Sequence, residues 1–401
     1  MTHPRLHLAS FCLIGLSLVG CATQPAPPTL PVAQTSSPAV VALPAEGFVR
    51  DWVTNLPLDG STLIEIHLRD DAVFAYDAKH NAYLIDRTSG QLISIAPVTG
   101  ANNALRPPVV LGDRIIYPTT STLEVFNRQG RRLRSIDLGF AIRSDATGAS
   151  TNTVYVGSDY GNGGRLSAID LDKDFGFLKW ELTTFGGVSG KPVVVQNVTY
   201  VGGEDGRVYA VNPDRGATWT LDRGAFETNG PIYADMAGDD YGIYVASFDG
   251  KLYCLDRLSG KIKWMWYSSS PLKHTPFATT NMVYQQTDKD GLVAIDKTSG
   301  EYVRKARWTA PDVKQFLAED EKRTYVLKND NSIAALDKAT GEELFVNTRN
   351  DFVAFAPNNK TAVLYAATAS GQVLAVKPIL RPGLTGELVM VPVNEPIALA
   401  R

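Results

Sequence analysis

Cysteine and histidine are scarce in this chain, and their scarcity excludes several kinds of site. The 401 residues include three cysteines and five histidines. Cys12 and Cys21 lie in the N-terminal leader, so the rest of the chain keeps only Cys254 and can form no internal disulfide. The three histidines outside the leader lie far apart, without metal-ligand spacing: His67, His80 and His274. We therefore expect no catalytic residues, no cofactor-binding residues and no metal ligands.

Dense runs of positive charge are also lacking. The formal net charge is -3 at pH 7 and the isoelectric point is about 6.0. The one local basic group consists of Arg128, Arg131, Arg132 and Arg134. A solvated turn and strand face accounts for such a group, so we expect no nucleic acid partner.

The leader, residues 1–21, has the pattern of an export signal. A basic Arg5 precedes an apolar run from Leu8 to Val19, which is too short to span a bilayer. The run ends in Leu18-Val19-Gly20-Cys21, which resembles the lipobox of bacterial lipoproteins. The resemblance implies that Cys21 carries a lipid, and Ala22 after it implies transfer to the outer membrane. The alternative is an ordinary cleaved signal peptide with an incidental cysteine.

Residues 22–47 are predicted to be a disordered tether. The segment contains six prolines and no charged residue before Glu46, so it has little with which to build a core. At roughly 3.1 Å per residue, an extended polyproline segment of about 25 residues reaches on the order of 75 Å. The tether lets the following domain stand off from a membrane.

Residues 48–380 consist of a repeated sequence pattern. Its clearest copy runs from Gly242 to Trp266, with strand-like runs separated by Asp249-Gly250 and Ser259-Gly260. Eight aromatic anchors, spaced 38 to 45 residues apart, mark the copies: Phe74, Tyr117, Tyr155, Tyr200, Tyr244, Tyr284, Tyr325 and Tyr365. A period of about 42 residues with several short strands is typical of propeller blades. The sequence therefore predicts an all-β, eight-bladed β-propeller of four-stranded antiparallel blades.

Proline is expected to open the innermost strand of several blades, where a missing backbone donor costs least. The first strands would follow Pro107, Pro192, Pro231 and Pro276. Ser158 to Gly164 interrupts the third copy with a glycine-rich stretch. We interpret it as a long mobile hairpin on one rim and a candidate contact loop.

The two ends of the repeat region complete each other. The last copy runs from Val373 to Val376 and then reaches Pro378 with no fourth strand. Phe48 to Leu56 precedes the first blade as an unpaired strand. This N-terminal strand is predicted to close the ring as the outer strand of the eighth blade, which protects two strand edges.

Tryptophan recurs at the ends of the predicted outer strands, often four residues after a glycine. Five of the six tryptophans fall there and are expected to pack between blades: Trp52, Trp180, Trp219, Trp264 and Trp308. Cys254 lies mid-strand, where a small buried hydrophobic residue is the expected role.

The repeats resemble those of pyrroloquinoline-quinone (PQQ)-type propellers. The clearest matches are Tyr200 to Val211 and Tyr244 to Trp264. The resemblance implies the fold, but the chain lacks the vicinal cysteines and long insertions of the quinone dehydrogenases. We therefore expect a non-enzymatic member without a cofactor.

A lipoprotein made of one eight-bladed ring is also similar to the scaffolds that assist outer-membrane barrel assembly. That resemblance implies a monomer anchored by lipid at the periplasmic face of the outer membrane, with the barrel-assembly machinery as protein partner. Two alternatives stay open: a ligand-binding or degenerate quinoprotein propeller holding a small molecule or Ca²⁺ in the central channel, and an adaptor for polysaccharide or peptidoglycan. The tail, residues 381–401, gives no basis for a role.

Overall fold

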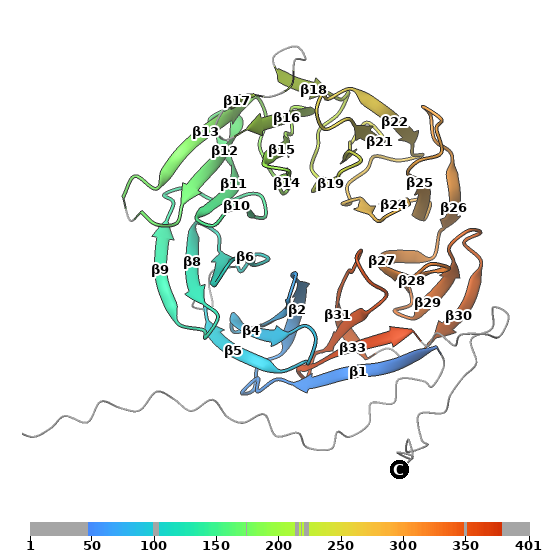
Figure 1. Ribbon diagram of the computed structural model, residues 1–401, viewed down its shortest axis with the longest axis horizontal. Helices are drawn as coiled ribbons and strands as arrows, with labels where there is room; N and C mark the ends of the chain where they lie inside the picture. The colour runs from blue at the N-terminus through green and yellow to red at the C-terminus, as the bar shows by residue number, and fades with distance from the viewer. Residues whose placement is uncertain are drawn as a thin grey trace, which may run out of the picture. The chain divides into compact units, whose positions relative to one another are not determined.

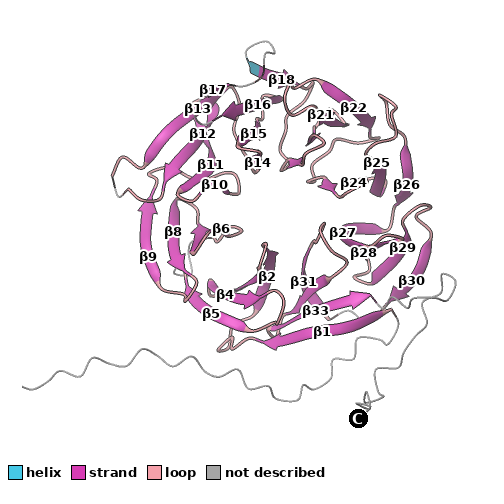
Figure 2. Ribbon diagram, viewed as in Figure 1, coloured by secondary structure: helices cyan, strands magenta, loops and turns pink. Residues whose placement is uncertain are grey.

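A computed structural model describes residues 47–98, 104–173, 175–212, 216–217, 219, 224–348 and 351–378. The strands form eight antiparallel sheets arranged as blades around a centre, as Figure 1 shows by chain order and Figure 2 by secondary structure. The predicted eight-bladed propeller is confirmed. The leader with Cys21, the tether and the tail lie outside the described residues.

Blades 1 to 4 follow one another along the chain. Blade 1 contains β2 (Leu63–Leu68), β3 (Ala72–Asp77), β4 (Asn81–Asp86) and β5 (Leu92–Pro97). Blade 2 contains β6 (Val109–Leu111), β7 (Arg114–Pro118), β8 (Thr122–Asn127) and β9 (Arg132–Asp137). Blade 3 contains β10 (Thr147–Ser150), β11 (Thr153–Tyr160), β12 (Gly163–Asp170) and β13 (Leu178–Thr184). Blade 4 contains β14 (Val193–Val195), β15 (Val198–Gly202) and β16 (Arg207–Asn212), with β17 (Gly216–Ala217) and β18 (Ala225–Glu227) sharing the outer position.

Blades 5 to 8 continue the order and complete the ring. Blade 5 contains β19 (Ala237–Gly238), β20 (Ile243–Ala246), β21 (Lys251–Leu255) and β22 (Ile262–Tyr267). Blade 6 contains β23 (Phe277–Ala278), β24 (Met282–Thr287), β25 (Gly291–Asp296) and β26 (Ala306–Ala310). Blade 7 contains β27 (Val313–Glu319), β28 (Arg323–Lys328), β29 (Ile333–Asp337) and β30 (Glu343–Asn347). Blade 8 contains β31 (Phe352–Ala356), β32 (Leu364–Thr368), β33 (Gln372–Pro378) and, outermost, β1 (Phe48–Asn55).

The N-terminal strand closes the ring as predicted. β1 pairs antiparallel with β33, with Phe48 opposite Pro378 and Asn55 opposite Gln372. The backbone groups along this edge of β33 are therefore paired rather than open to another chain.

The eight aromatic anchors all lie in the second strand of their blades and are buried. Second and third strands are covered on both faces by neighbouring blades, so β3 is buried along its whole length instead of alternating. A small residue in the third strand lies opposite most anchors, as Ala168 lies opposite Tyr155. That small residue leaves room for the aromatic side chain of the outer strand.

The apolar core lies between blades rather than inside them. One cluster joins Tyr155 and Leu166 of blade 3 to Val201 and Tyr209 of blade 4, with Val188 from the connection. Burying each such side chain stabilises the fold by roughly 1.5–3 kcal/mol relative to leaving it exposed. Neighbouring blades therefore depend on one another for their stability.

One expectation about a segment was wrong and another holds in part. No strand follows Pro231, because the backbone of Pro231 and Ile232 bonds to Phe248 and Gly203 in the rim turns, and the first strand of blade 5 forms later, at β19. The stretch from Ser158 to Gly164 is a hairpin as predicted, but its residues belong to β11 and β12, which are joined by a two-residue turn, rather than to a long loop. A Cβ on Gly163 would overlap the carbonyl oxygen of Thr184, so close strand packing explains that glycine.

The antiparallel meander divides the turns of each blade between two rims. We name rim A the side that carries the turns joining first to second and third to fourth strands. Rim B carries the turns joining second to third strands and the connections to the next blade. In blade 5, residues 239–242 and 256–261 lie on rim A, and residues 247–250 lie on rim B.

Candidate protein-interaction surface

Rim B of blades 3 to 5 presents a row of exposed aromatic side chains. Their exposed fractions are 57% for Tyr160, 68% for Phe185, 44% for Tyr233, 38% for Phe248 and 52% for Tyr267. Single exposed apolar residues are ordinary, but several exposed aromatics on one rim make it a candidate interaction surface. We name these five residues the aromatic rim.

Basic side chains from the third strands hold several of these rings. In blade 3 the guanidinium of Arg165 lies 4.3 Å from the ring centre of Phe140 and 4.8 Å from that of Tyr160. It also pairs with Glu181 at 3.1 Å. Phe140 belongs to the connection from blade 2, so this stack crosses the boundary between blades and fixes Tyr160 in its exposed position.

The arrangement recurs in blades 4 and 5. The guanidinium of Arg207 lies 4.7 Å from the ring centre of Phe185 and its Nη2 pairs with Glu227 at 2.7 Å. In blade 5 the Nζ of Lys251 lies 5.7 Å from the ring centre of Tyr267. Because the rings rest on cations, they stay at the surface and lose little conformational freedom on binding a partner.

The turns beneath the aromatic rim are held by an aspartate and a tyrosine. In blade 4 Asp205 accepts hydrogen bonds from the backbone N–H of Arg207 at 3.0 Å and from the Tyr209 hydroxyl at 2.7 Å. In blade 5 Asp249 accepts the Tyr253 hydroxyl at 2.6 Å. Burial, together with the neighbouring aspartate, raises the pKa of both tyrosine hydroxyls well above the ordinary value, so both remain donors. The Asp-Gly-x-x-Tyr repeat thus gives rim B rigid turns.

Charged groups of both signs surround the aromatic rim. Arg143 reaches Asp159 at 3.6 Å and Glu204 at 3.3 Å. Ser189 donates to the same Glu204 carboxylate at 2.9 Å. An apolar centre with a mixed polar border is the usual anatomy of a protein–protein interface.

The predicted tryptophans contact the following blade. Trp52, Trp219 and Trp308 are buried. Each indole N–H donates to a backbone carbonyl in the turn between the third and fourth strands of the next blade: Trp52 to Arg87 at 2.9 Å, Trp219 to Arg257 at 3.0 Å and Trp308 to Lys338 at 3.0 Å. Trp264 is completely buried with the guanidinium of Arg304 5.4 Å from its ring, and Trp180 is half-buried beside Tyr155.

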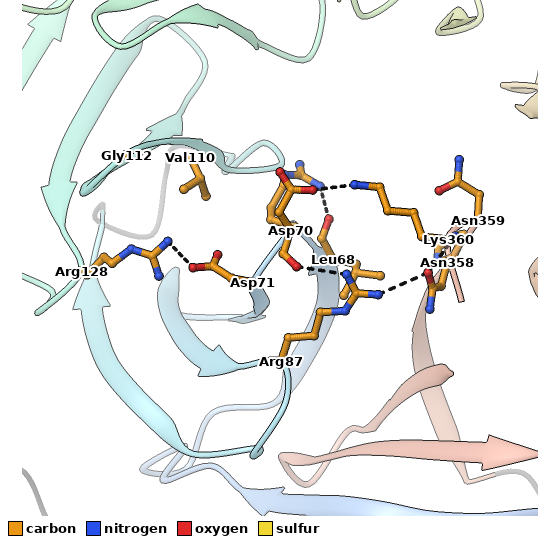
Figure 3. Close-up of a pocket in the computed structure, with 12 residues that line it drawn as sticks. Leu68, Asp70, Asp71, Arg87, Val110, Gly112, Arg128, Asn358, Asn359 and Lys360 are labelled. Carbon is orange, nitrogen blue, oxygen red and sulfur yellow. Dashed lines mark hydrogen bonds and ion pairs between the residues drawn. The ribbon is translucent and has the colours of Figure 1, made fainter. Parts of the chain in front are cut away.

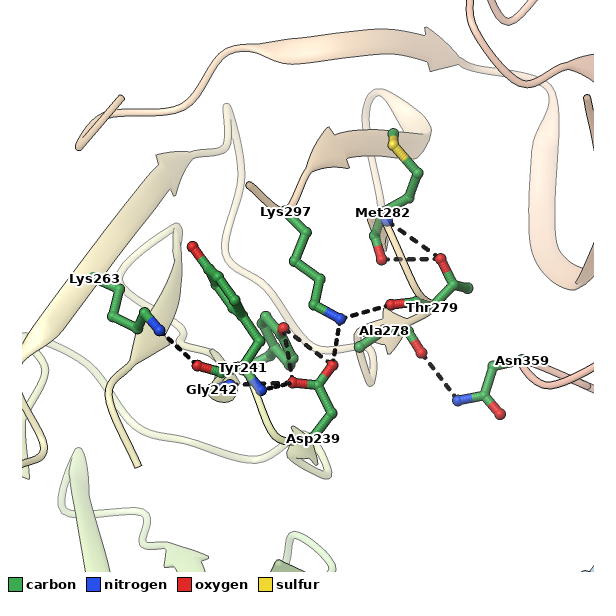
Figure 4. Close-up of polar contacts among 10 residues, drawn as sticks. Asp239, Tyr241, Gly242, Lys263, Ala278, Thr279, Met282, Lys297 and Asn359 are labelled. Atoms are coloured by element: carbon green, nitrogen blue, oxygen red, sulfur yellow. Dashed lines mark hydrogen bonds and ion pairs between the residues drawn. The ribbon is translucent and has the colours of Figure 1, made fainter. Parts of the chain in front are cut away.

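Rim A carries polar contacts that join blades. Asp239 accepts the backbone N–H groups of Tyr241 and Gly242, and its other oxygen accepts Lys297 Nζ at 2.6 Å (Figure 4). Since Asp239 belongs to blade 5 and Lys297 to blade 6, the pair links two blades. Asn359 of blade 8 donates to the carbonyl of Ala278 in blade 6 at 3.0 Å (Figure 4). These bonds tie neighbouring and more distant blades together on rim A.

The sequence interpretation named one part of the aromatic rim, the stretch from Ser158 to Gly164 with Tyr160, and missed the rest. Phe185 and Tyr233 lie in the connections between repeats, where no periodicity assigns a side chain to a face. The sequence did contain a signal: an aromatic residue in a connection has no predicted place in the core, which suggests a role at the surface. Cys21, the predicted lipid site, lies outside the described residues.

Metal sites and membrane spans receive no support from the described residues. Within them no group of three or more histidine, cysteine or acidic side chains is arranged to hold a metal ion. No helix in that part of the chain has the length and hydrophobicity needed to span a membrane.

Comparison with known proteins agrees with the fold. A family model described as outer membrane protein assembly factor BamB matches residues 119–234 and 205–318. The crystal structure of BamB from Moraxella catarrhalis superposes with a TM-score of 0.61 and 19% identity, over 82% of this chain and 97% of that one. A search of curated proteins gave no match.

Other solved propellers are similar in shape alone. The computationally designed Ika8 protein gives a TM-score of 0.59 at 17% identity, over 80% of this chain and 98% of that one. The C-terminal WD40 domain of Sif2 gives a TM-score of 0.61 at 13% identity, over 84% of this chain and 99% of that one. Such identities establish the fold and leave function to the site. Repeats, family match and fold together make this chain a PQQ-like β-propeller of the BamB type.

Proposed function

We propose that this chain is a non-catalytic scaffold that holds a protein partner in the cell envelope through the aromatic rim. The leader sequence supports a lipid at Cys21 and a tether over residues 22–47. In this proposal the ring stands off from the periplasmic face of the outer membrane, with rim B free to dock.

The observation that carries the proposal is the aromatic rim on blades 3 to 5. Aromatic residues and arginine are enriched at the centres of protein interfaces, and a few such residues supply most of the binding energy. Phe185 and Tyr160 each rest on an arginine and are more than half exposed. A surface that is ordered before binding has less conformational entropy to lose.

We propose the outer-membrane barrel-assembly machinery as the partner. The support is the likeness to BamB, whose family description is an outer membrane protein assembly factor. The aromatic rim would bind a partner segment with apolar side chains, and the charged border would fix its orientation.

A crosslinked pull-down from extracted membranes tests this function. The tagged full chain is compared with Phe185→Ala and with Phe175→Ala, since Phe175 is 94% exposed on rim A of the same region. We expect mass spectrometry to find a barrel-assembly protein, with recovery reduced about tenfold by Phe185→Ala and unchanged by Phe175→Ala. Cys21→Ser should release the chain from the membrane fraction. Equal recovery from both phenylalanine variants, or no barrel-assembly protein, would contradict the proposal.

A further inference from the structure

A cavity on rim A brings together basic side chains from blades 8, 1 and 2. It has a volume of about 570 Å³ and is lined by segments 68–71 and 357–360, with Arg87, Val110, Gly112 and Arg128 (Figure 3). Small-molecule sites usually have volumes of roughly 300–1,000 Å³. The cavity is separate from the aromatic rim, because all of these turns belong to the opposite rim.

The charge of the cavity is positive. Its lining includes four cationic side chains, Arg69, Arg87, Arg128 and Lys360, and two carboxylates, Asp70 and Asp71, so the formal charge is +2. The two carboxylates are already paired, Asp70 with Lys360 at 2.7 Å and Asp71 with Arg128 at 2.6 Å (Figure 3). Two arginine charges are left to be balanced.

Arg87 is held by neutral acceptors. Its Nε donates to the Tyr365 hydroxyl at 3.0 Å, its Nη1 to the carbonyl of Asp70 at 3.1 Å and its Nη2 to the Asn358 side chain at 3.4 Å. Among the residues that the structure describes, no carboxylate lies at ion-pair distance from this guanidinium. These bonds position the guanidinium without a direct ion pair, and the carboxylate whose charge acts on it, Asp70, is already paired with Lys360.

Arg69 is in the same condition. Its Nε donates to the carbonyl of Pro108 at 2.7 Å and its Nη1 to the carbonyl of Leu68 at 2.7 Å. Burial lowers the pKa of Arg69 below its ordinary value, and the opposing charges of Asp145 and Asp70 do not fully offset this effect. A bound anion would supply the missing stabilisation.

From this arrangement we propose that the cavity binds a phosphoryl group. Arg69 and Arg87 supply the positive charge that holds the group, and Lys360 and Arg128 lie at the edge of the cavity. Arginine's planar donors match phosphate oxygens, and charge-assisted hydrogen bonds are about twice as strong as neutral ones. The phosphoryl group belongs either to a soluble phosphate compound or to a phospholipid headgroup. The cavity has walls from residues 69–71 of blade 1 and 357–360 of blade 8, so binding links the first and last blades.

Calorimetric titration with inorganic pyrophosphate at constant ionic strength tests the proposal. The full chain carries Cys21→Ser, so that no lipid anchor contributes. We expect pyrophosphate to bind and to raise the melting temperature, and Arg87→Gln to weaken binding by about tenfold or more. Lys322→Gln is the matched control, since Lys322 lines another rim A cavity whose charges balance. It should change the affinity for pyrophosphate less than about twofold. That change is smaller than the loss expected when one charge-assisted hydrogen bond to the ligand is removed.

A second variant separates binding from loss of structure. Asp71→Asn removes a half-exposed carboxylate and frees Arg128, so pyrophosphate should bind more tightly than to the parent chain. Impaired folding cannot produce that gain. Unchanged or weaker binding by Asp71→Asn, equal binding by Arg87→Gln and the parent, or no binding by the parent would each overturn the proposal.

Vesicles identify the source of the phosphoryl group. The same chains are sedimented with phosphatidylcholine vesicles containing phosphatidylglycerol. Sedimentation that is lost in Arg87→Gln and kept in Lys322→Gln assigns the cavity to a lipid headgroup. Pyrophosphate binding without sedimentation assigns it to a soluble phosphate compound.

Discussion

The indole N–H of Trp52 donates to the backbone carbonyl of Arg87 at 2.9 Å. Trp52 lies in β1, the outer strand of blade 8, and Arg87 lies in the turn after β4 of blade 1. The same bond recurs between Trp308 and Lys338, so ring closure uses the contact that joins ordinary neighbours. A propeller closed by two chain ends therefore has no special junction at this position.

Truncating Trp52 should be costly. Trp52→Ala removes a buried ring and its hydrogen bond, so we expect a loss of about 3–5 kcal/mol in the free energy of unfolding. Trp52→Phe keeps much of the ring and should cost less. Urea unfolding followed by circular dichroism measures both, and a loss below about 1 kcal/mol for Trp52→Ala would show that the contact is not structural.

Two glycines in equivalent turns differ in what lies beside them. Gly341 (φ +77) faces the ring of Trp308, and an added Cβ would lie 2.6 Å from Trp308 Cγ. Gly300 (φ +89) has no atom within 4 Å of such a Cβ. Both alanine variants carry the strain of a positive φ, but Gly341→Ala should cost about 1–3 kcal/mol more because it overpacks the contact between blades. Equal unfolding free energies would disprove this packing role.

Acid should weaken the turns between third and fourth strands. The Asp337 carboxylate accepts the backbone N–H groups of Thr340 at 2.9 Å and Ala339 at 2.8 Å, and these bonds lower its pKa. A lowered folded-state pKa stabilises the protein above the unfolded value, and that stability is lost as pH falls through the folded value. We expect stability to fall below about pH 4.

Asp337→Asn gives the matching control for this titration. The asparagine oxygen can still accept the two N–H bonds but does not ionise, so the variant should lose less stability between neutral and acid pH than the parent. Melting temperatures measured across that range provide the comparison. Identical melting temperatures for the two proteins at every pH would show that Asp337 does not contribute to the loss of stability in acid.

Cys254 should be unreactive in the folded protein. Its thiol is completely buried in the third strand of blade 5, and burial raises its pKa above the ordinary value. Only the thiolate reacts readily, so labelling must wait for the blade to open. Pulsed alkylation read by peptide mass spectrometry should show labelling only in denaturant. Rapid labelling of the native chain would indicate that blade 5 opens locally.

Predictions from the sequence were right for residues that have the same structural role in every repeat. Tyr244 and Trp264 could be assigned because each residue type recurs at about the same place in successive repeats. Closure by β1 followed from counting strands in the last copy. Residue type and position within the repeat are enough to predict these elements, because every blade packs against its neighbours in the same way.

Sequence reasoning failed where contacts depend on the finished ring. Arg87 bonds to Tyr365 across 278 positions, and nothing local in either segment indicates the cavity that Arg87 lines. Pro231 has the same local pattern as Pro192, yet Ile232 behind it fills the core between blades and no strand forms. Phe185 was not assigned because connections have no periodicity to define a face.

A photocrosslinking amino acid placed at position 185, and in a second chain at position 175, tests the scaffold account most directly. Both positions hold an exposed phenylalanine, one on each rim. After irradiation of intact cells, we expect position 185 to crosslink a barrel-assembly protein and position 175 to give no such product. Equal crosslinking from both positions, or that product from position 175 alone, would contradict docking through the aromatic rim.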